Sequence, residues 1–222
     1  MSSLGLSDFM LKALWKAFVD TVTMVGISAV IVWFAGIALA MVLVTTARGA
    51  IFSAPTLNRV LGGFINAFRA TPFIILLVAL IPLTRLLVGT TIGVWAAVVP
   101  ITLSATPFFA RIVEVSLREV GGGVIEAAQS LGCERRHIIF NVLLPEALPG
   151  IIGGFTITIV AMIGASAMAG AIGAGGLGDL AIRYGYQRYD TAMMLAVIAI
   201  LIVLVCGIQY VGDRYVGYLR AR

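Results

Sequence analysis

The chain has 222 residues, of which 61% are hydrophobic and 11% are charged, and its formal net charge is +5. Soluble domains carry about 25% charged residues, so this composition excludes a chain that is solvated by water alone and predicts an integral membrane protein. The sequence contains no basic run with interleaved aromatic residues, which argues against nucleic acid as a partner. Cys133 and Cys206 lie in separate segments without a paired spacing, so we predict neither a disulfide nor a metal site.

Stretches without charge set the predicted membrane spans, because a charged side chain at the centre of a spanning helix costs about 2.5–3.5 kcal/mol. A span needs roughly 20 residues at a rise of about 1.5 Å per residue. We therefore predict one all-α membrane domain over residues 1–222 with five transmembrane helices, at approximately 20–46, 60–84, 88–110, 149–172 and 191–212. The second span has to include Arg69, whose side chain either reaches the lipid headgroups or faces a protein partner or the transport pathway.

The apolar pattern before the first span, and the prolines within later spans, predict local departures from straight crossing helices. Apolar residues in Phe9–Val19 fall near one face, which favours an interfacial helix that leads into the first span. Prolines inside the spans predict kinks at Pro72, Pro82, Pro100 and Pro107.

The distribution of basic residues predicts the orientation of the chain. Five spans place the two termini on opposite sides of the membrane, and the connections between spans then fall into two sets. The richer set contains Arg48, Arg59, Arg111, Arg118, Arg135, Arg136, Arg214, Arg220 and Arg222, whereas the poorer set contains Lys12, Lys16, Arg85, Arg183 and Arg188. The richer side is cytoplasmic by the positive-inside rule, so we expect the C-terminus in the cytoplasm and the N-terminus outside.

Residues 113–148 form the longest connection between two spans, and we expect them on the cytoplasmic side. Their pattern favours two short helices, over Val124–Leu131 and Glu134–Leu143. Gly132 falls between the two helices, where we expect a left-handed conformation that glycine adopts most freely. Leu144-Pro145 is predicted to redirect the chain, since proline lacks a donor and disfavours a helical residue before it.

The spacing of residues within this connection resembles the "EAA" loop of bacterial ABC importer permeases. In that family the pattern is Glu-Ala-Ala, three residues, Gly, nine residues, Ile, one residue and Leu-Pro. The matching positions here are Glu126, Ala127, Ala128, Gly132, Val142, Leu144 and Pro145. Val142 stands where the family has isoleucine, and it keeps a β-branched apolar side chain.

The resemblance implies the type I ABC importer permease architecture, in which five transmembrane helices carry a cytoplasmic coupling-helix loop. That helix would dock in a groove of a separate ATPase subunit, which binds ATP and Mg²⁺. The chain itself would then be non-catalytic and hold no cofactor, and its sequence contains no glycine-rich phosphate loop ending in Gly-Lys-Ser/Thr. The implied assembly lies in the bacterial cytoplasmic (inner) membrane, surrounded by lipid. It contains two copies of this chain, two ATPase subunits and an extracytoplasmic solute-binding protein.

Two further stretches, Phe68–Arg85 and Ala169–Asp190, look like the corresponding parts of methionine importer permeases. This resemblance implies the import of L-methionine, with the D form as a further substrate, and leaves another small amino acid or solute as the alternative. We expect the fourth span to line or gate the pathway through Met162, Ser166 and Met168, for which plain helix packing is the alternative.

The connection between the fourth and fifth spans, residues 173–190, is expected to be an extracytoplasmic loop. Its residues Arg183, Tyr184, Tyr186 and Arg188 are typical of a surface that docks the binding protein, because interfaces are enriched in Tyr and Arg. Anchoring at the membrane interface explains the same residues equally well.

Other patterns point to different functions but lack the context that those functions need. Gly173, Gly175 and Gly178 spell the dinucleotide fingerprint G-x-G-x-x-G, yet they follow a membrane span and so favour a tight turn or a close-packed re-entry. Asp179 and Asp190 resemble elements of intramembrane aspartyl proteases, but in reversed order and at span edges. A membrane scaffold or channel that needs no ATPase is the alternative from a different class.

Overall fold

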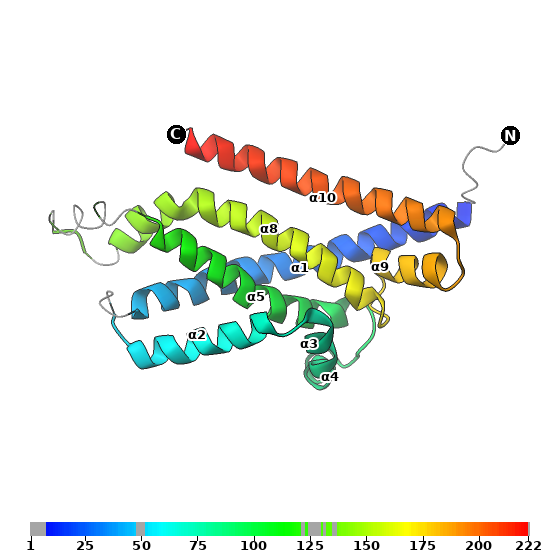
Figure 1. The fold of residues 1–222 in the computed structure, drawn as a ribbon, viewed down its shortest axis with the longest axis horizontal. Helices are drawn as coiled ribbons and strands as arrows, with labels where there is room; N and C mark the ends of the chain where they lie inside the picture. Colours follow the sequence, from blue (N-terminus) through cyan, green and yellow to red (C-terminus); the bar gives the residue numbers. More distant parts are fainter. Residues whose placement is uncertain are drawn as a thin grey trace. The chain divides into compact units, whose positions relative to one another are not determined.

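The computed structural model of the chain describes residues 8–47, 52–120, 123, 130, 132–134 and 137–221. The regular elements in these residues are helices, and no strand occurs among them (Figure 1). They are α1 (Asp8–Thr46), α2 (Pro55–Ala70), α3 (Phe73–Ala79), α4 (Ile81–Val88), α5 (Val94–Arg118), the π-helix η1 (Ile138–Leu143), α8 (Leu144–Gly170), α9 (Gly176–Leu180), the π-helix η2 (Ala181–Tyr186) and α10 (Thr191–Arg220). The all-α fold class predicted from the sequence is confirmed.

The chain divides into two compact units, which we describe separately. The first unit contains Met1–Ile31, Thr71–Ala105 and Ile159–Gln209, and the second contains Val32–Ala70, Thr106–Thr158 and Tyr210–Arg222. Each of the long helices α1, α5, α8 and α10 contributes residues to both units.

Four helices in the described residues are long and apolar enough to cross a membrane, namely Met10–Thr46, Val94–Arg118, Ile138–Gly170 and Thr191–Arg220. A fifth candidate is the pair of α2 and α3, which passes the same test when the two helices are taken as one broken span. The number of spans therefore reaches the predicted five when this pair is counted as one span.

The span predicted over residues 60–84, with kinks at Pro72 and Pro82, is divided more sharply than expected, because the chain forms three separate helices there. The helices α2 and α3 are bent by 107° relative to one another. Pro72, with φ −56° and ψ 136°, immediately precedes α3, and Pro82 lies in the first turn of α4. Proline lacks an N–H and disfavours a helical residue before it, so each of these prolines marks the start of a new helix. Pro100 and Pro107 lie within α5, which is assigned as one helix over its whole length.

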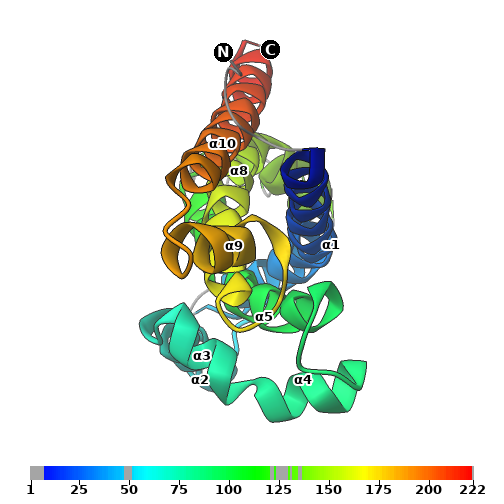
Figure 2. The same cartoon turned by 90° about the vertical axis from the view of Figure 1, so that its right-hand side faces the viewer.

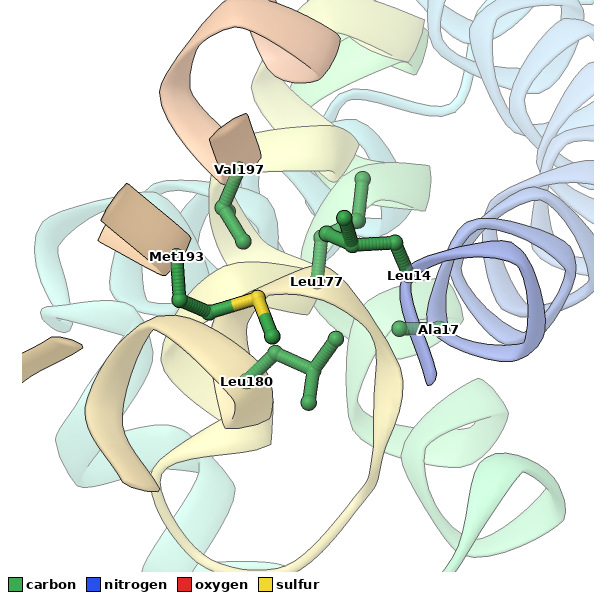
Figure 3. Close-up of a cluster of buried hydrophobic side chains, with 6 residues drawn as sticks. All are labelled: Leu14, Ala17, Leu177, Leu180, Met193 and Val197. Carbon is green, nitrogen blue, oxygen red and sulfur yellow. The ribbon is translucent and has the colours of Figure 1, made fainter. Parts of the chain in front are cut away.

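A cluster of buried apolar side chains joins three helices of the first unit (Figure 3). Leu14 and Ala17 come from α1, Leu177 and Leu180 from α9, and Met193 and Val197 from α10. Close packing of such side chains holds helices together within a membrane, where removal of apolar surface from water is not available as a driving force.

This cluster corrects the prediction that Phe9–Val19 forms an interfacial helix leading into the first span. The helix α1 runs without interruption from Asp8 to Thr46, and the apolar face predicted for a lipid surface includes Leu14 and Ala17, which pack inside the unit instead.

Close backbone contact between α9 and the end of α8 depends on glycine (Figure 2). A Cβ atom on Gly178 would overlap the backbone of Ala167, and one on Gly170 would overlap the backbone at Gly178 and Asp179. Gly173 (φ +91°) and Gly175 (φ +81°) have positive φ angles in the intervening turn, which glycine adopts most readily. The tight turn predicted for the G-x-G-x-x-G pattern is confirmed.

The second unit contains a cluster of three aromatic rings. The ring of Trp33 lies 5.8 Å from that of Phe109 and 4.8 Å from that of Phe155, and the two phenylalanine rings are 5.2 Å apart, all between centroids. Elsewhere in this unit the Asn58 side chain of α2 donates hydrogen bonds to the Leu43 carbonyl (2.6 Å) and to Thr46 Oγ1 (3.1 Å). The amide thereby satisfies a carbonyl in the last turn of α1, where helices leave such groups without intrahelical partners.

We expect Gly178→Ala to lower the melting temperature of the protein in detergent solution, measured by thermal unfolding. The new Cβ would overlap backbone atoms of Ala167, which have little freedom to move aside, and overpacking typically costs about 1–3 kcal/mol. Gly26→Ala is the control, because a Cβ at Gly26 meets no atom within 4 Å and alanine favours a helix. Equal melting temperatures for the two variants would contradict the proposed importance of this contact.

Candidate functional site

The segment that resembles the coupling loop is described in part. Glu126, Ala127 and Ala128 lie outside the described residues, so the helix expected there stays a prediction. Gly132 has φ +73°, which confirms the predicted left-handed turn at this position. A Cβ atom on Gly132 would meet no atom within 4 Å, so the backbone conformation, rather than space, favours glycine here.

Leu144-Pro145 does not redirect the chain, and this prediction is wrong. The π-helix η1 passes directly into α8, so a single helical stretch runs from Ile138 to Gly170. The Leu144 N–H donates to the carbonyl of Ile139, five residues earlier. The Pro145 ring crowds the carbonyl four residues before it and offers no N–H, and a widened turn accommodates both features without a change of direction.

The end of this segment borders a polar groove in the second unit. Val142 and Leu144 are half-buried, while Pro145 is exposed. The groove combines the ends of α5 and α10 with the beginning of α8, and its lining residues are Ser116, Glu119, Val120, Pro145, Glu146, Ala147, Pro149, Gly150, Leu219 and Arg220. The structure thus brings one residue of the predicted coupling motif to the rim of a groove with both acidic and basic side chains.

The three residues expected to line a pathway differ in exposure. Met162 is 1% exposed and Ser166 is 3% exposed, and the Ser166 hydroxyl donates to the Ile163 carbonyl at 2.7 Å. Met168 is 49% exposed. Of the three side chains, Met168 is therefore the one available at the surface of this chain.

The connection over residues 173–190 is mostly helical rather than the expected loop, because α9 and η2 occupy Gly176–Tyr186. Arg183 forms an ion pair with Asp179, and the Arg188 guanidinium lies over the Tyr184 ring at 4.7 Å from its centroid. Tyr186 is exposed. The predicted docking residues therefore lie close together in sequence on η2 and just after it, with both arginines engaged by neighbouring side chains.

The two aspartates considered for protease chemistry have structural partners in the first unit. Asp179 pairs with Arg183, and Asp190 Oδ1 accepts a hydrogen bond from the Met193 N–H at 3.0 Å, as an N-terminal cap of α10 does. Among the residues that the structure describes, no group of three His, Cys, Asp or Glu side chains is placed to hold a metal ion.

A charged cluster near the end of α5 was missed in the sequence. Glu114 accepts from Arg111 Nη1 at 2.6 Å and from Arg118 Nη2 at 2.8 Å, and its side chain is 3% exposed. The sequence does contain the pattern for this cluster. A glutamate three residues after one arginine and four residues before another lies next to both arginines on a helix. The positive-inside rule considers how many arginines lie on each side of the membrane and does not consider their spacing from Glu114.

The long apolar helices define a multi-pass helical membrane protein. Residues 46–222 match the family described as "Binding-protein-dependent transport system inner membrane component", and the chain belongs to this family. Family membership indicates a role in transport rather than in catalysis.

Named relatives cover almost the whole chain. The chain is 49% identical to the "Probable D-methionine transport system permease protein MetI" of Vibrio cholerae serotype O1, over 95% of this chain and 92% of that protein. It is 41% identical to the "Methionine import system permease protein MetP" of Bacillus subtilis, over 96% of both chains.

Solved structures share the fold. A chain of the MetNI methionine ABC transporter in an inward-facing conformation superposes with a TM-score of 0.93 at 43% identity, over 96% of this chain and 99% of that one. A chain of an amino acid ABC transporter, solved with histidines, gives a TM-score of 0.81 at 19% identity over 98% and 99% of the two chains, and shows a common fold.

We expect Gly150→Ala to destabilise the second unit, because its Cβ would lie 2.7 Å from Ser116 Oγ and 3.0 Å from Ser116 Cβ. The cost should be about 1–3 kcal/mol in thermal or denaturant unfolding. Adding Ser116→Ala should recover part of this loss, since it removes the nearest atom, so the double variant should be more stable than the sum predicts. Gly153→Ala serves as the control, because its Cβ would make ordinary contact with Val216 at 3.8 Å. Strict additivity would contradict the packing described here.

Proposed function

We propose that this chain is the membrane permease subunit of an ATP-driven importer of methionine. The observation that carries the proposal is the TM-score of 0.93 and 43% identity with a chain of the MetNI methionine ABC transporter, over 96% of this chain. Relatives that are 41% and 49% identical carry methionine transport in their names, which supports the same substrate. Import of another small amino acid or solute by the same machinery is the alternative.

The proposed assembly divides the work among separate proteins. Two copies of this chain form the pathway, and two ATPase subunits bind ATP and Mg²⁺ and hydrolyse the nucleotide. An extracytoplasmic binding protein delivers the solute. The C-terminus of the permease lies in the cytoplasm and its N-terminus outside, as the distribution of arginine and lysine favours.

Coupling to the ATPase rests on the motif from Glu126 to Pro145. Glu126, Ala127 and Ala128 would dock in the ATPase, and Gly132 would turn the chain back toward the membrane. The absence of a helix break at Pro145 supports this role, because the end of the motif is then continuous with the first turns of α8 in the second unit. Val142, Leu144 and Pro145 belong to this continuous helical stretch.

The pathway lies between the two copies in this proposal, so a lining residue has to be exposed on each separate chain. Met168 meets this requirement, with 49% exposure. Met162 and Ser166 are buried within the chain and would act by packing the helix that presents Met168. A symmetric pair of flexible thioethers would form a gate that adapts to an apolar solute.

Docking of the binding protein is proposed for the surface formed by Arg183, Tyr184, Tyr186 and Arg188. The ion pair with Asp179 and the stacking on Tyr184 restrict both arginines before a partner binds. Restricting long side chains in advance lowers the entropy cost of association.

The substrate is tested by uptake of labelled methionine into cells that lack other methionine importers. Cells with this chain, its ATPase and its binding protein should accumulate methionine, and cells without this chain should not. Unlabelled D-methionine in excess is expected to compete. Uptake that is unchanged by deleting the chain would contradict the proposal, and uptake of a different amino acid with no uptake of methionine would establish the alternative.

The coupling role is tested by replacing Gly132. Gly132→Val should lower transport about tenfold or more, because a β-branched residue is strained at φ +73°, and about 1.4 kcal/mol corresponds to a factor of ten. Gly132→Asn should retain more activity, since asparagine tolerates this conformation. Transport and stimulated ATP hydrolysis are measured in the reconstituted assembly. Valine and asparagine variants that behave alike would contradict a role for the turn.

A further inference from the structure

Two arginines near the end of α5 share one buried carboxylate. Glu114 Oε2 accepts from Arg111 Nη1 at 2.6 Å, and Glu114 Oε1 accepts from Arg118 Nη2 at 2.8 Å and from Arg118 Nε at 3.0 Å. Both carboxylate oxygens are thus occupied. The three charges sum to a net charge of +1, so the cluster remains positive.

The positive charge of this cluster faces outward. The side chain of Glu114 is 3% exposed, whereas those of Arg111 and Arg118 are 44% and 54% exposed. An arginine carries five N–H donors, so each guanidinium keeps donors that Glu114 does not use. The buried carboxylate fixes the orientation of two planar groups that are partly exposed.

The two arginines lie on one face of α5. They are seven residues apart, which corresponds to two helical turns or about 10 Å along the axis, and exposed Val115 lies between them. The opposite face packs inward, since Ile112 and Ser116 lie against Gly154 and Gly150 of α8. A single arginine would neutralise Glu114, so the second guanidinium gives the cluster an excess of one positive charge.

The cluster lies where a membrane helix leaves the hydrocarbon. Arg111 is 17 residues beyond Val94, the start of α5 (Val94–Arg118), and these residues span about 25 Å at the helical rise. The hydrocarbon core of a bilayer is about 30 Å thick, so Arg111 and Arg118 fall near and beyond its edge. Phosphate groups of lipids occupy this depth.

We propose that Arg111 and Arg118, held in place by Glu114, bind the phosphate of an anionic lipid headgroup. Guanidinium groups match phosphate in geometry and charge, and basic sites at this depth on membrane proteins recognise anionic headgroups. Val115 would contact the glycerol or upper acyl region of the same lipid. This inference requires that the chain spans a membrane, and it is independent of the transported solute.

The test measures lipid binding to the intact assembly in nanodiscs of phosphatidylglycerol and phosphatidylcholine. Native mass spectrometry counts lipids retained after release, and the wild type should retain phosphatidylglycerol in preference to phosphatidylcholine. Arg111→Gln with Arg118→Gln should lower this retention tenfold or more. The triple variant that also carries Glu114→Gln should show the same loss without leaving a buried carboxylate unpaired.

Two further variants separate a built site from general attraction. Glu114→Gln alone raises the net charge, so non-specific attraction would strengthen lipid binding, whereas a site oriented by Glu114 should bind several-fold more weakly. Arg59→Gln with Arg214→Gln removes the same charge from exposed positions of the second unit and should leave retention unchanged.

Stronger lipid retention by the Glu114→Gln variant than by the wild type would overturn the proposal, and so would three further results. The first is equal retention of the two lipids by the wild type, and the second is an equal loss in the Arg59 and Arg214 control. The third is displacement of the bound lipid by free methionine at concentrations that saturate transport, because the cluster would then bind the carboxylate of the solute.

Discussion

The first unit depends on a backbone contact that side chains would prevent. Gly170 and Gly178 allow α9 to lie directly against the end of α8, and an added Cβ at either position would overlap main-chain atoms. This contact fixes α9 where Leu177 and Leu180 meet apolar residues of α1 and α10. The Leu177 N–H also donates to Thr21 Oγ1 of α1 at 2.9 Å, so a buried donor of the short helix is satisfied. The packing of the unit depends on this close contact between α8 and α9. Lipid hydrocarbon provides little hydrophobic driving force for helices to associate, so tight van der Waals packing has to stabilise their association.

Much of the fold was predictable because charged side chains are costly at the centre of a membrane-spanning helix, so spans coincide with stretches that carry no charge. The uncharged stretches located the first, third, fourth and fifth spans, and the structure has a long apolar helix at each. The second span was predicted with kinks at Pro72 and Pro82, but the sequence did not show that these prolines mark the starts of separate helices. The interfacial helix and the turn at Leu144-Pro145 failed for a related reason. Local pattern does not show whether an apolar face meets lipid or another helix, nor whether a widened turn accommodates a proline.

The candidate site was predictable where spacing carries information. The resemblance to the coupling motif rests on the spacing of seven positions from Glu126 to Pro145, and its role in coupling stays a prediction. The left-handed turn at Gly132 follows from residue type. The exposure of Met162, Ser166 and Met168 depends on which side of α8 faces a neighbour, and a uniformly apolar helix gives no amphipathic signal for this. Glu114, Arg111 and Arg118 have a clear helical spacing, yet the burial of Glu114 becomes visible only when the packed face of α5 is known.

The π-helix η1 determines how far the residues before Ile138 are rotated about the helix axis relative to α8. A π-turn accommodates one more residue than an α-turn, and one residue corresponds to about 100° of rotation around a helix. If Ile138–Leu143 tightened to α-geometry, residues before Ile138 would rotate relative to α8 by roughly that amount. Insertions and deletions in this stretch therefore change which side chains point toward a partner, even when they leave the length and apolarity of the membrane helix intact.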